Sequence, residues 1–190
     1  LPAAEMLRVM DLVGVRTFVN VTANTALPFS DGQYSAERRD IRHFMDKYVK
    51  RYPGRFAGFT MSSFADWSDL VLFKTPSFVD RTIAEMESDV ACGALGLKVT
   101  KELGLRFKAP DGTMIPVDDA RLFPVWQRAG EIGIPVLIHV SDPIAFFQPV
   151  DEYNEPSDHF LLPPPSTVDR RVHEDLYHDR HGRRGGDSHQ

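Results

Sequence analysis

The residue with the clearest chemical potential is His139, which lies near the end of the apolar run VLIHVSD. The flanking aliphatic residues predict a β-strand, with the imidazole close to its carboxyl end. An imidazole in that place can bind a divalent metal through one nitrogen while a neighbouring group holds the other nitrogen. The alternative is a core histidine that hydrogen-bonds to a loop.

Four further polar residues are candidates for contact with a small-molecule substrate: Lys98, Thr100, Asn20 and Asp142. Lys98 could pair with an anionic substrate or bridge metals as a carbamate. A lysine can equally form a structural ion pair or extend its charge to solvent. Asp142 could hold His139 or a metal-bound water, or it could cap the turn at the proline that follows it.

A helix followed by a strand recurs four times and must position these residues. Each predicted helix ends at a glycine of the kind found just beyond helix C-termini: Gly14, Gly54, Gly93 and Gly133. The strand-like runs that follow are VRTFVNVT, RFAGFTMSS, ALGLKVTK and IPVLIHVS, which begin 40, 39 and 40 residues apart. Helices are expected over 1–13 and around 41–48, 79–90 and 122–129, with Ser77 and Asp118 or Asp119 as N-caps. This alternation predicts an α/β fold with parallel strands and right-handed crossovers.

The alternation of side chains within the runs favours a barrel over a doubly wound sheet. One set is apolar, and the other is polar near the strand ends: Asn20, Thr22, Thr60, Ser62, Lys98, Thr100, His139 and Ser141. A barrel mouth accepts a polar inner face, whereas helices on both sides of a sheet require two apolar faces. Eight such units need about 250 residues, so four strands predict an incomplete barrel. An open doubly wound domain that binds a small ligand is the rival interpretation.

Composition excludes several classes of function. The 190 residues, 42% of them hydrophobic, suffice for one domain with a core. A net charge of −5 with interleaved signs argues against nucleic-acid binding, and no run is long and apolar enough to span a membrane. The single cysteine, Cys92, indicates a reducing compartment, and we expect the cytoplasm. Motifs of serine hydrolases, dinucleotide-binding domains and P-loop proteins are absent from the sequence.

The chain divides by composition into a predicted domain over 1–155 and a polar tail over 156–190. The tail contains a Pro-Pro-Pro run and few apolar residues, so we expect it to be disordered or weakly helical. Its histidines, for which adventitious metal affinity is the expected property, are His159, His173, His178, His181 and His189. Because the first residue is Leu1 and a helix starts at once, the chain is expected to begin inside a longer protein.

One long segment carries a resemblance to a known family. The stretch GLKVTKELGLRFKAPDGTMIPVDDARLFPVWQRAGEIGIPVLIHVSDPIAFFQPVDEYNE resembles the middle of proteins of the second amidohydrolase family, which includes aminocarboxymuconate-semialdehyde and resorcylate decarboxylases and lactone hydrolases. MDLVGVRTFVNVT and RYPGRFAGFT are similar to its second and third units. The resemblance covers about residues 1–155 and implies a TIM-type barrel with a divalent metal, often zinc, in its mouth.

The resemblance implies that the visible strands are the second to the fifth of eight. His139 matches the family's fifth-strand histidine ligand, whereas the ligands of the first and eighth strands have no counterpart here. Beyond DEYNE the sequence departs from the family, which suggests a truncated or frame-shifted gene. We therefore expect a metal-dependent hydrolase or decarboxylase ancestry with weak metal binding and little turnover. The alternative is a non-catalytic half-barrel remnant that self-associates to cover its open sheet edges.

Overall fold

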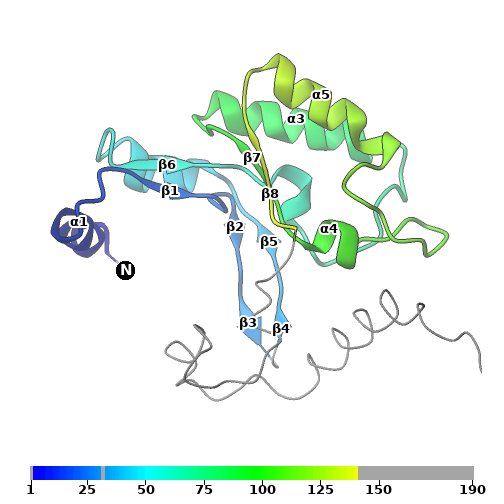
Figure 1. Cartoon of the computed structure of the whole chain (residues 1–190), viewed down its shortest axis with the longest axis horizontal. Coiled ribbons are helices and arrows are strands. Elements are labelled where there is room, and N and C mark those ends of the chain that lie inside the picture. Colours follow the sequence, from blue (N-terminus) through cyan, green and yellow to red (C-terminus); the bar gives the residue numbers. More distant parts are fainter. Residues whose placement is uncertain (1, 31–32, 141–190) are drawn as a thin grey trace, which may run out of the picture. The chain divides into compact units, whose positions relative to one another are not determined.

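Four short parallel strands run through the part of the chain that the computed structural model describes, residues 2–30 and 33–140. They are β1 (Phe18–Asn20), β6 (Phe56–Gly58), β7 (Leu97–Val99) and β8 (Val136–Ile138). β1 pairs with β6 and β7 pairs with β8, both in parallel (Figure 1). Thr60 joins the two pairs, because its N–H donates to Gly96 and its carbonyl accepts from Lys98, at 2.9 and 2.7 Å. The predicted α/β class and parallel pairing are confirmed.

A helical segment precedes each of these strands, where the apolar stripes predict it. These segments are α1 (Ala3–Leu12), α2 (Arg42–Phe44) with a π-helical turn over Met45–Val49, α3 (Phe78–Ala91), and α5 (Phe123–Glu131) after a 3-10 turn over Ala120–Leu122. Gly14, Gly54, Gly93 and Gly133 all have positive φ, from 73° to 111°. The helix ends predicted from Gly14, Gly93 and Gly133 are therefore confirmed, since each glycine directly follows the C-cap residue of its helix. Gly54 instead lies in a turn that comes after the helical segment has ended at Val49.

The predicted N-caps have different outcomes. Ser77 occupies the N-cap position of α3, but its hydroxyl makes no capping hydrogen bond and lies 3.2 Å from the hydroxyl of Thr75. Asp119 caps the turn before α5, since its carboxylate accepts from the N–H of Arg121 at 3.0 Å. No helix in residues 2–30 and 33–140 is long and apolar enough to cross a bilayer.

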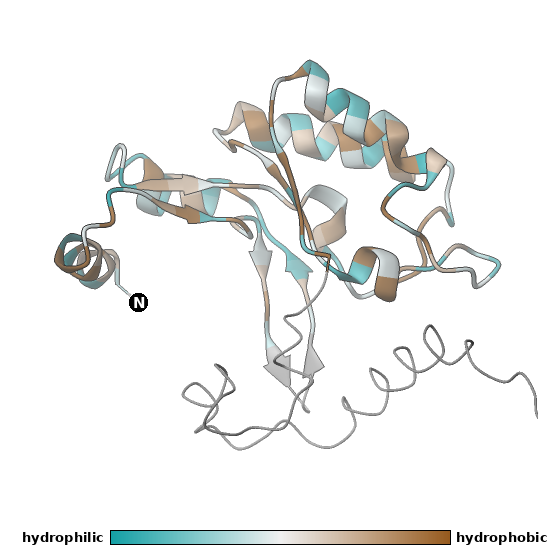
Figure 2. Cartoon of the chain, viewed as in Figure 1, coloured by the Kyte–Doolittle hydropathy of each residue, from teal (hydrophilic) through white to brown (hydrophobic). Residues whose placement is uncertain are grey.

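Two apolar clusters stabilise the strands. In the larger one, α3 and α5 lie side by side and pack on one face of β7 and β8 (Figure 1). Both helices carry apolar and polar residues along their length, as amphipathic packing requires (Figure 2). The fully buried members include Leu97 and Val99 of β7, Met86 of α3 and Val125 of α5. In the smaller cluster, α1 and the α2 segment pack around Phe56 of β6.

A hairpin over residues 25–38 was not predicted from the sequence. Its strands are β2 (Thr25–Ala26), β3 (Phe29–Ser30), β4 (Gln33–Tyr34) and β5 (Glu37–Arg38). β2 pairs with β5 and β3 with β4, both antiparallel. Pairs of only two residues leave no detectable alternation in the sequence, so the pattern used for the longer runs missed them.

The predicted single polar face is wrong for Thr60 and, by register, for Asn20. Thr60 pairs with Leu97, whose side chain packs beneath α3, so Thr60 faces this helix and Lys98 falls on the opposite face. Asn20 pairs with Gly58, where an added Cβ would meet Met45 and Phe44 of the α2 segment at 2.9 and 3.2 Å. A shift of one residue in register exchanges the two faces of a strand, and the sequence does not fix that register.

No closed barrel is present among the described residues. Ser141, Asp142, the boundary expected at residue 155 and the tail with its five histidines lie outside them.

Candidate functional site

The strand ends of β7 and β8 bring three of the predicted site residues onto one face. Leu97 and Val99 face the helices, so Lys98 and Thr100 alternate to the opposite face. The register pairs Lys98 with Leu137, and the next step in that register brings Thr100 beside His139. The backbone N–H of His139 donates to Val99 at 3.0 Å and fixes this alignment.

Lys98 is buried to an unusual extent for a lysine, with only 9% of its surface exposed. Burial lowers the pKa of its ammonium group, and the negative charge of Glu102 opposes that shift. In the part of the chain that is described, the ammonium group makes no ion pair within 4 Å. This amine is therefore more easily deprotonated than an exposed lysine.

Two buried oxygen atoms beside Lys98 in the chain lack hydrogen-bond partners. They are Oγ1 of Thr100 and Oε2 of Glu102, the only such side-chain atoms within residues 2–30 and 33–140. An unsatisfied buried polar atom costs about 1–3 kcal/mol, so proteins keep few of them. The strand end thus presents a hydroxyl and a carboxylate oxygen whose hydrogen-bonding capacity is unused.

The backbone after β7 holds Glu102 in place through a tight turn, labelled α4 (Glu102–Leu105). The carbonyl of Glu102 accepts from the N–H groups of Arg106 and Phe107, both at 2.8 Å. Leu103 is buried in the larger cluster, and Gly104 takes a φ of 100° that favours glycine. Sequence analysis missed Glu102. Its position two residues beyond Thr100, at a strand end, was the signal that could have found it.

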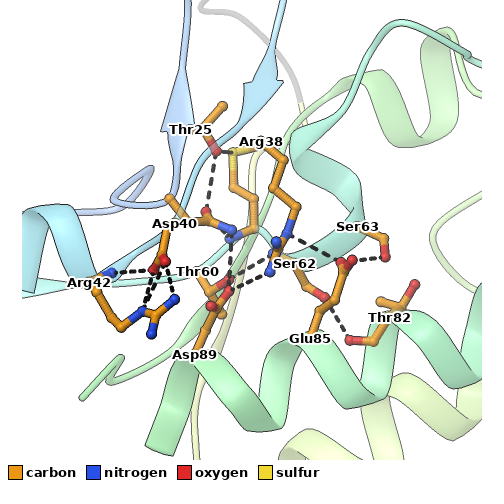
Figure 3. A network of polar contacts seen from close by, with 12 residues as sticks. Thr25, Arg38, Asp40, Arg42, Thr60, Ser62, Ser63, Thr82, Glu85 and Asp89 are labelled. Atoms are coloured by element: carbon orange, nitrogen blue, oxygen red, sulfur yellow. Dashed lines mark hydrogen bonds and ion pairs between the residues drawn. The ribbon is translucent and has the colours of Figure 1, made fainter. Parts of the chain in front are cut away.

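A second polar cluster surrounds Asp89 on the face that α3 covers (Figure 3). The carboxylate accepts hydrogen bonds from Thr60 at 2.5 Å, Asn24 at 3.3 Å and Arg38 at 3.4 Å. Burial raises the pKa of Asp89, while the Thr60 hydroxyl and the Arg38 charge act in the opposite direction. These contacts join the hairpin, the end of β6 and α3.

The remaining contacts of this second cluster are also between protein groups. Arg38 bridges to Glu85 at 3.3 Å, and Glu85 accepts from Ser63 at 2.7 Å (Figure 3). A hollow of about 350 Å³ lies beside it, lined by Arg38, Arg39, Asp40, Arg42, Ser88, Asp89 and Cys92. Asp40 binds Arg42, which lowers the pKa of Asp40 to about 2. Because its charges pair within the protein, we interpret this cluster as a structural tie.

The structure does not join Asn20 to the strand-end residues. Its Oδ1 accepts from the N–H and hydroxyl of Thr22 at 3.0 and 3.2 Å, which stabilises the turn after β1. Asp142 lies outside the described residues. His139 is half-buried beside Thr100, as the register requires. The cluster of Lys98, Thr100, Glu102 and His139 is called the strand-end site below.

Comparisons with known proteins do not assign this site. A scan against models of protein families finds none that matches, and a search of curated proteins finds no match. Within residues 2–30 and 33–140, no group of three or more histidine, cysteine or acidic side chains is arranged to hold a metal ion. A catalytic zinc site uses about three protein ligands, a number that the described residues do not bring together.

Proposed function

We propose that this chain forms part of the mouth of a metal-dependent hydrolase or carbon-carbon lyase of the amidohydrolase type, built on strands two to five of a β/α-barrel. The observation that supports the proposal best is the strand-end site: Lys98, Thr100 and His139 share one face of adjacent parallel strands, at their carboxyl ends. In β/α-barrels this is the end where active sites lie. The helix-covered face on the other side is apolar at these strands, which agrees with an outer layer.

In this proposal His139 is a neutral ligand to a divalent metal such as zinc, and Lys98 and Thr100 face the substrate. A bound metal lowers the pKa of water toward neutrality and polarises a carbonyl or carboxylate. The substrate is then a small carboxylated or cyclic molecule that is hydrolysed or decarboxylated. With one ligand in the described residues, the chain alone binds metal weakly and has little activity.

Zinc titration against a competing chelator tests the role of His139. His139→Ala should weaken zinc binding, whereas His43→Ala, which alters an exposed histidine of α2, should leave it unchanged. Both variants keep the same five tail histidines, so adventitious binding by the tail cancels in the comparison. Equal affinity in the two variants would contradict the proposal.

A non-catalytic, self-associating half-barrel is the second candidate. Large apolar side chains at the outer strands β1 and β8 support it: Phe18 and Val19 are each 43% exposed, as is Leu137, and Val140 is 72% exposed. Such a surface favours association with a second copy. Sedimentation equilibrium tests this candidate, because a chain that stays monomeric at high concentration does not self-associate to cover these side chains.

A further inference from the structure

The strand-end site contains a buried amine, that of Lys98, for which the metal-dependent function has no covalent role. Lys98 is 9% exposed, and the unpartnered oxygens of Thr100 and Glu102 lie at the same strand end. Glu102 is itself only 6% exposed, so its carboxylate is held in the protein interior. Thr100 and His139 are half-buried, which places the site close to the surface.

Without a metal at His139, whose positive charge would admit a carboxylate, charge balance restricts the chemical class of a ligand for this site. An anionic ligand would be repelled by the negative charge of Glu102, and a cationic ligand would be repelled by the positive charge of Lys98. A small uncharged molecule with an acceptor oxygen avoids both conflicts. A carbonyl oxygen can accept from the Thr100 hydroxyl, and a hydroxyl on the ligand can donate to Glu102 Oε2.

We propose that Lys98 is a nucleophilic amine that forms an imine with a small uncharged aldehyde or ketone, that the Thr100 hydroxyl orients the carbonyl, and that Glu102 transfers the protons. The proposal rests on the shared strand face of Lys98 and Thr100, on the burial of Lys98 and Glu102 and on the two unpartnered oxygens, and it is independent of a metal at His139. Lysines that serve as Schiff-base nucleophiles are activated by desolvation of this kind. The lowered pKa of Lys98 increases the fraction of neutral amine and supports the same role.

The reaction balances without an oxidant or a reductant. The lone pair of Lys98 Nζ attacks the carbonyl carbon, a C–N bond forms, and the carbonyl π electrons move to oxygen. Glu102 takes a proton from nitrogen and delivers it to that oxygen, which gives a carbinolamine. The C–O bond then breaks, and the oxygen leaves as water with both amine protons. The products are one imine and one water.

Reductive trapping of the full chain tests the inference. The probe is dihydroxyacetone with sodium cyanoborohydride, which converts an imine into a stable secondary amine, and peptide mapping by mass spectrometry locates the adduct. Lys98 should be modified several-fold faster than Lys50 and Lys74, which are exposed and bound to Asp46 and Asp69. Adducts at the exposed lysines with none at Lys98, or equal rates at all three, would overturn the inference. This result needs no variant and so does not depend on how a variant folds.

Four variants then separate proton transfer from a structural role. Glu102→Gln should slow trapping at Lys98 several-fold and leave trapping at Lys50 unchanged. Lys98→Arg should lose the adduct altogether, whereas Lys50→Arg should retain it. His139→Ala should keep the adduct, so failure of the metal proposal and failure of this one give different results. Unchanged trapping in Glu102→Gln would remove Glu102 from the mechanism.

Discussion

Replacement of Asp89 by alanine measures how strongly the second polar cluster stabilises the fold. The carboxylate is the shared acceptor for Thr60 and Asn24, both fully buried, and for Arg38 (Figure 3). In Asp89→Ala the Thr60 hydroxyl and the Asn24 amide lose this acceptor, at about 1–3 kcal/mol each. Arg38 keeps Glu85, so its loss is small.

The expected decrease in the free energy of unfolding is about 2–5 kcal/mol, reduced somewhat because the burial cost of the carboxylate is also removed. Urea denaturation followed by far-ultraviolet circular dichroism measures it, and a loss of about 2 kcal/mol moves the midpoint by roughly 1 M. Asp46→Ala is the matched control. It removes an exposed pair with Lys50 four residues along the helical segment, which solvent screens, so only a small loss of stability is expected. If Asp89→Ala loses no more stability than this control, the cluster does not tie the elements together.

Two further predictions concern the pH dependence of stability and the packing around two glycines. The pKa of Asp89 is raised above 3.8 in the folded protein. Its contribution to stability is therefore complete below about pH 4 and decreases as the pH rises through the raised pKa. The pKa of Asp40 is lowered to about 2, so this residue loses its contribution to stability as the pH falls from about 4 to 2. Urea unfolding of Asp89→Asn and Asp40→Asn beside the parent chain, between pH 7 and 2, should show these opposite trends, and parallel curves would contradict both. Gly96→Ala should destabilise by about 1–3 kcal/mol, because its Cβ would overlap the Phe59 ring. Gly130→Ala in α5 meets no atom within 4 Å and should stabilise by about 0.5–1 kcal/mol, so thermal unfolding that ranks these two alanine variants the other way would refute the packing argument.

Only some residues of the candidate site could be predicted from the sequence. His139, Lys98 and Thr100 could be found because each stands near the carboxyl end of a recognisable strand, where short-range pattern is informative. Glu102 and Asp89 were missed, since nothing in their local sequence marks them as buried. The burial of a carboxylate depends on which distant segments cover it. For Asp89, the residues that contact the carboxylate include Asn24 and Thr60, which lie 65 and 29 residues away along the chain.

The sequence by itself determined the order and type of the main elements, because helix and strand periodicity, and glycine at helix ends, are local properties. Gly14, Gly93 and Gly133 marked the helix ends because an L-residue with a side chain rarely adopts their positive φ. Only the tertiary structure decided which face each strand residue occupies. Phe59 lies over Gly96, Thr60 aligns with Leu97, and Lys98 therefore turns away from Asp89 and α3. The pairing of strands about 40 residues apart sets that register through packing, and a displacement of one residue exchanges the two faces.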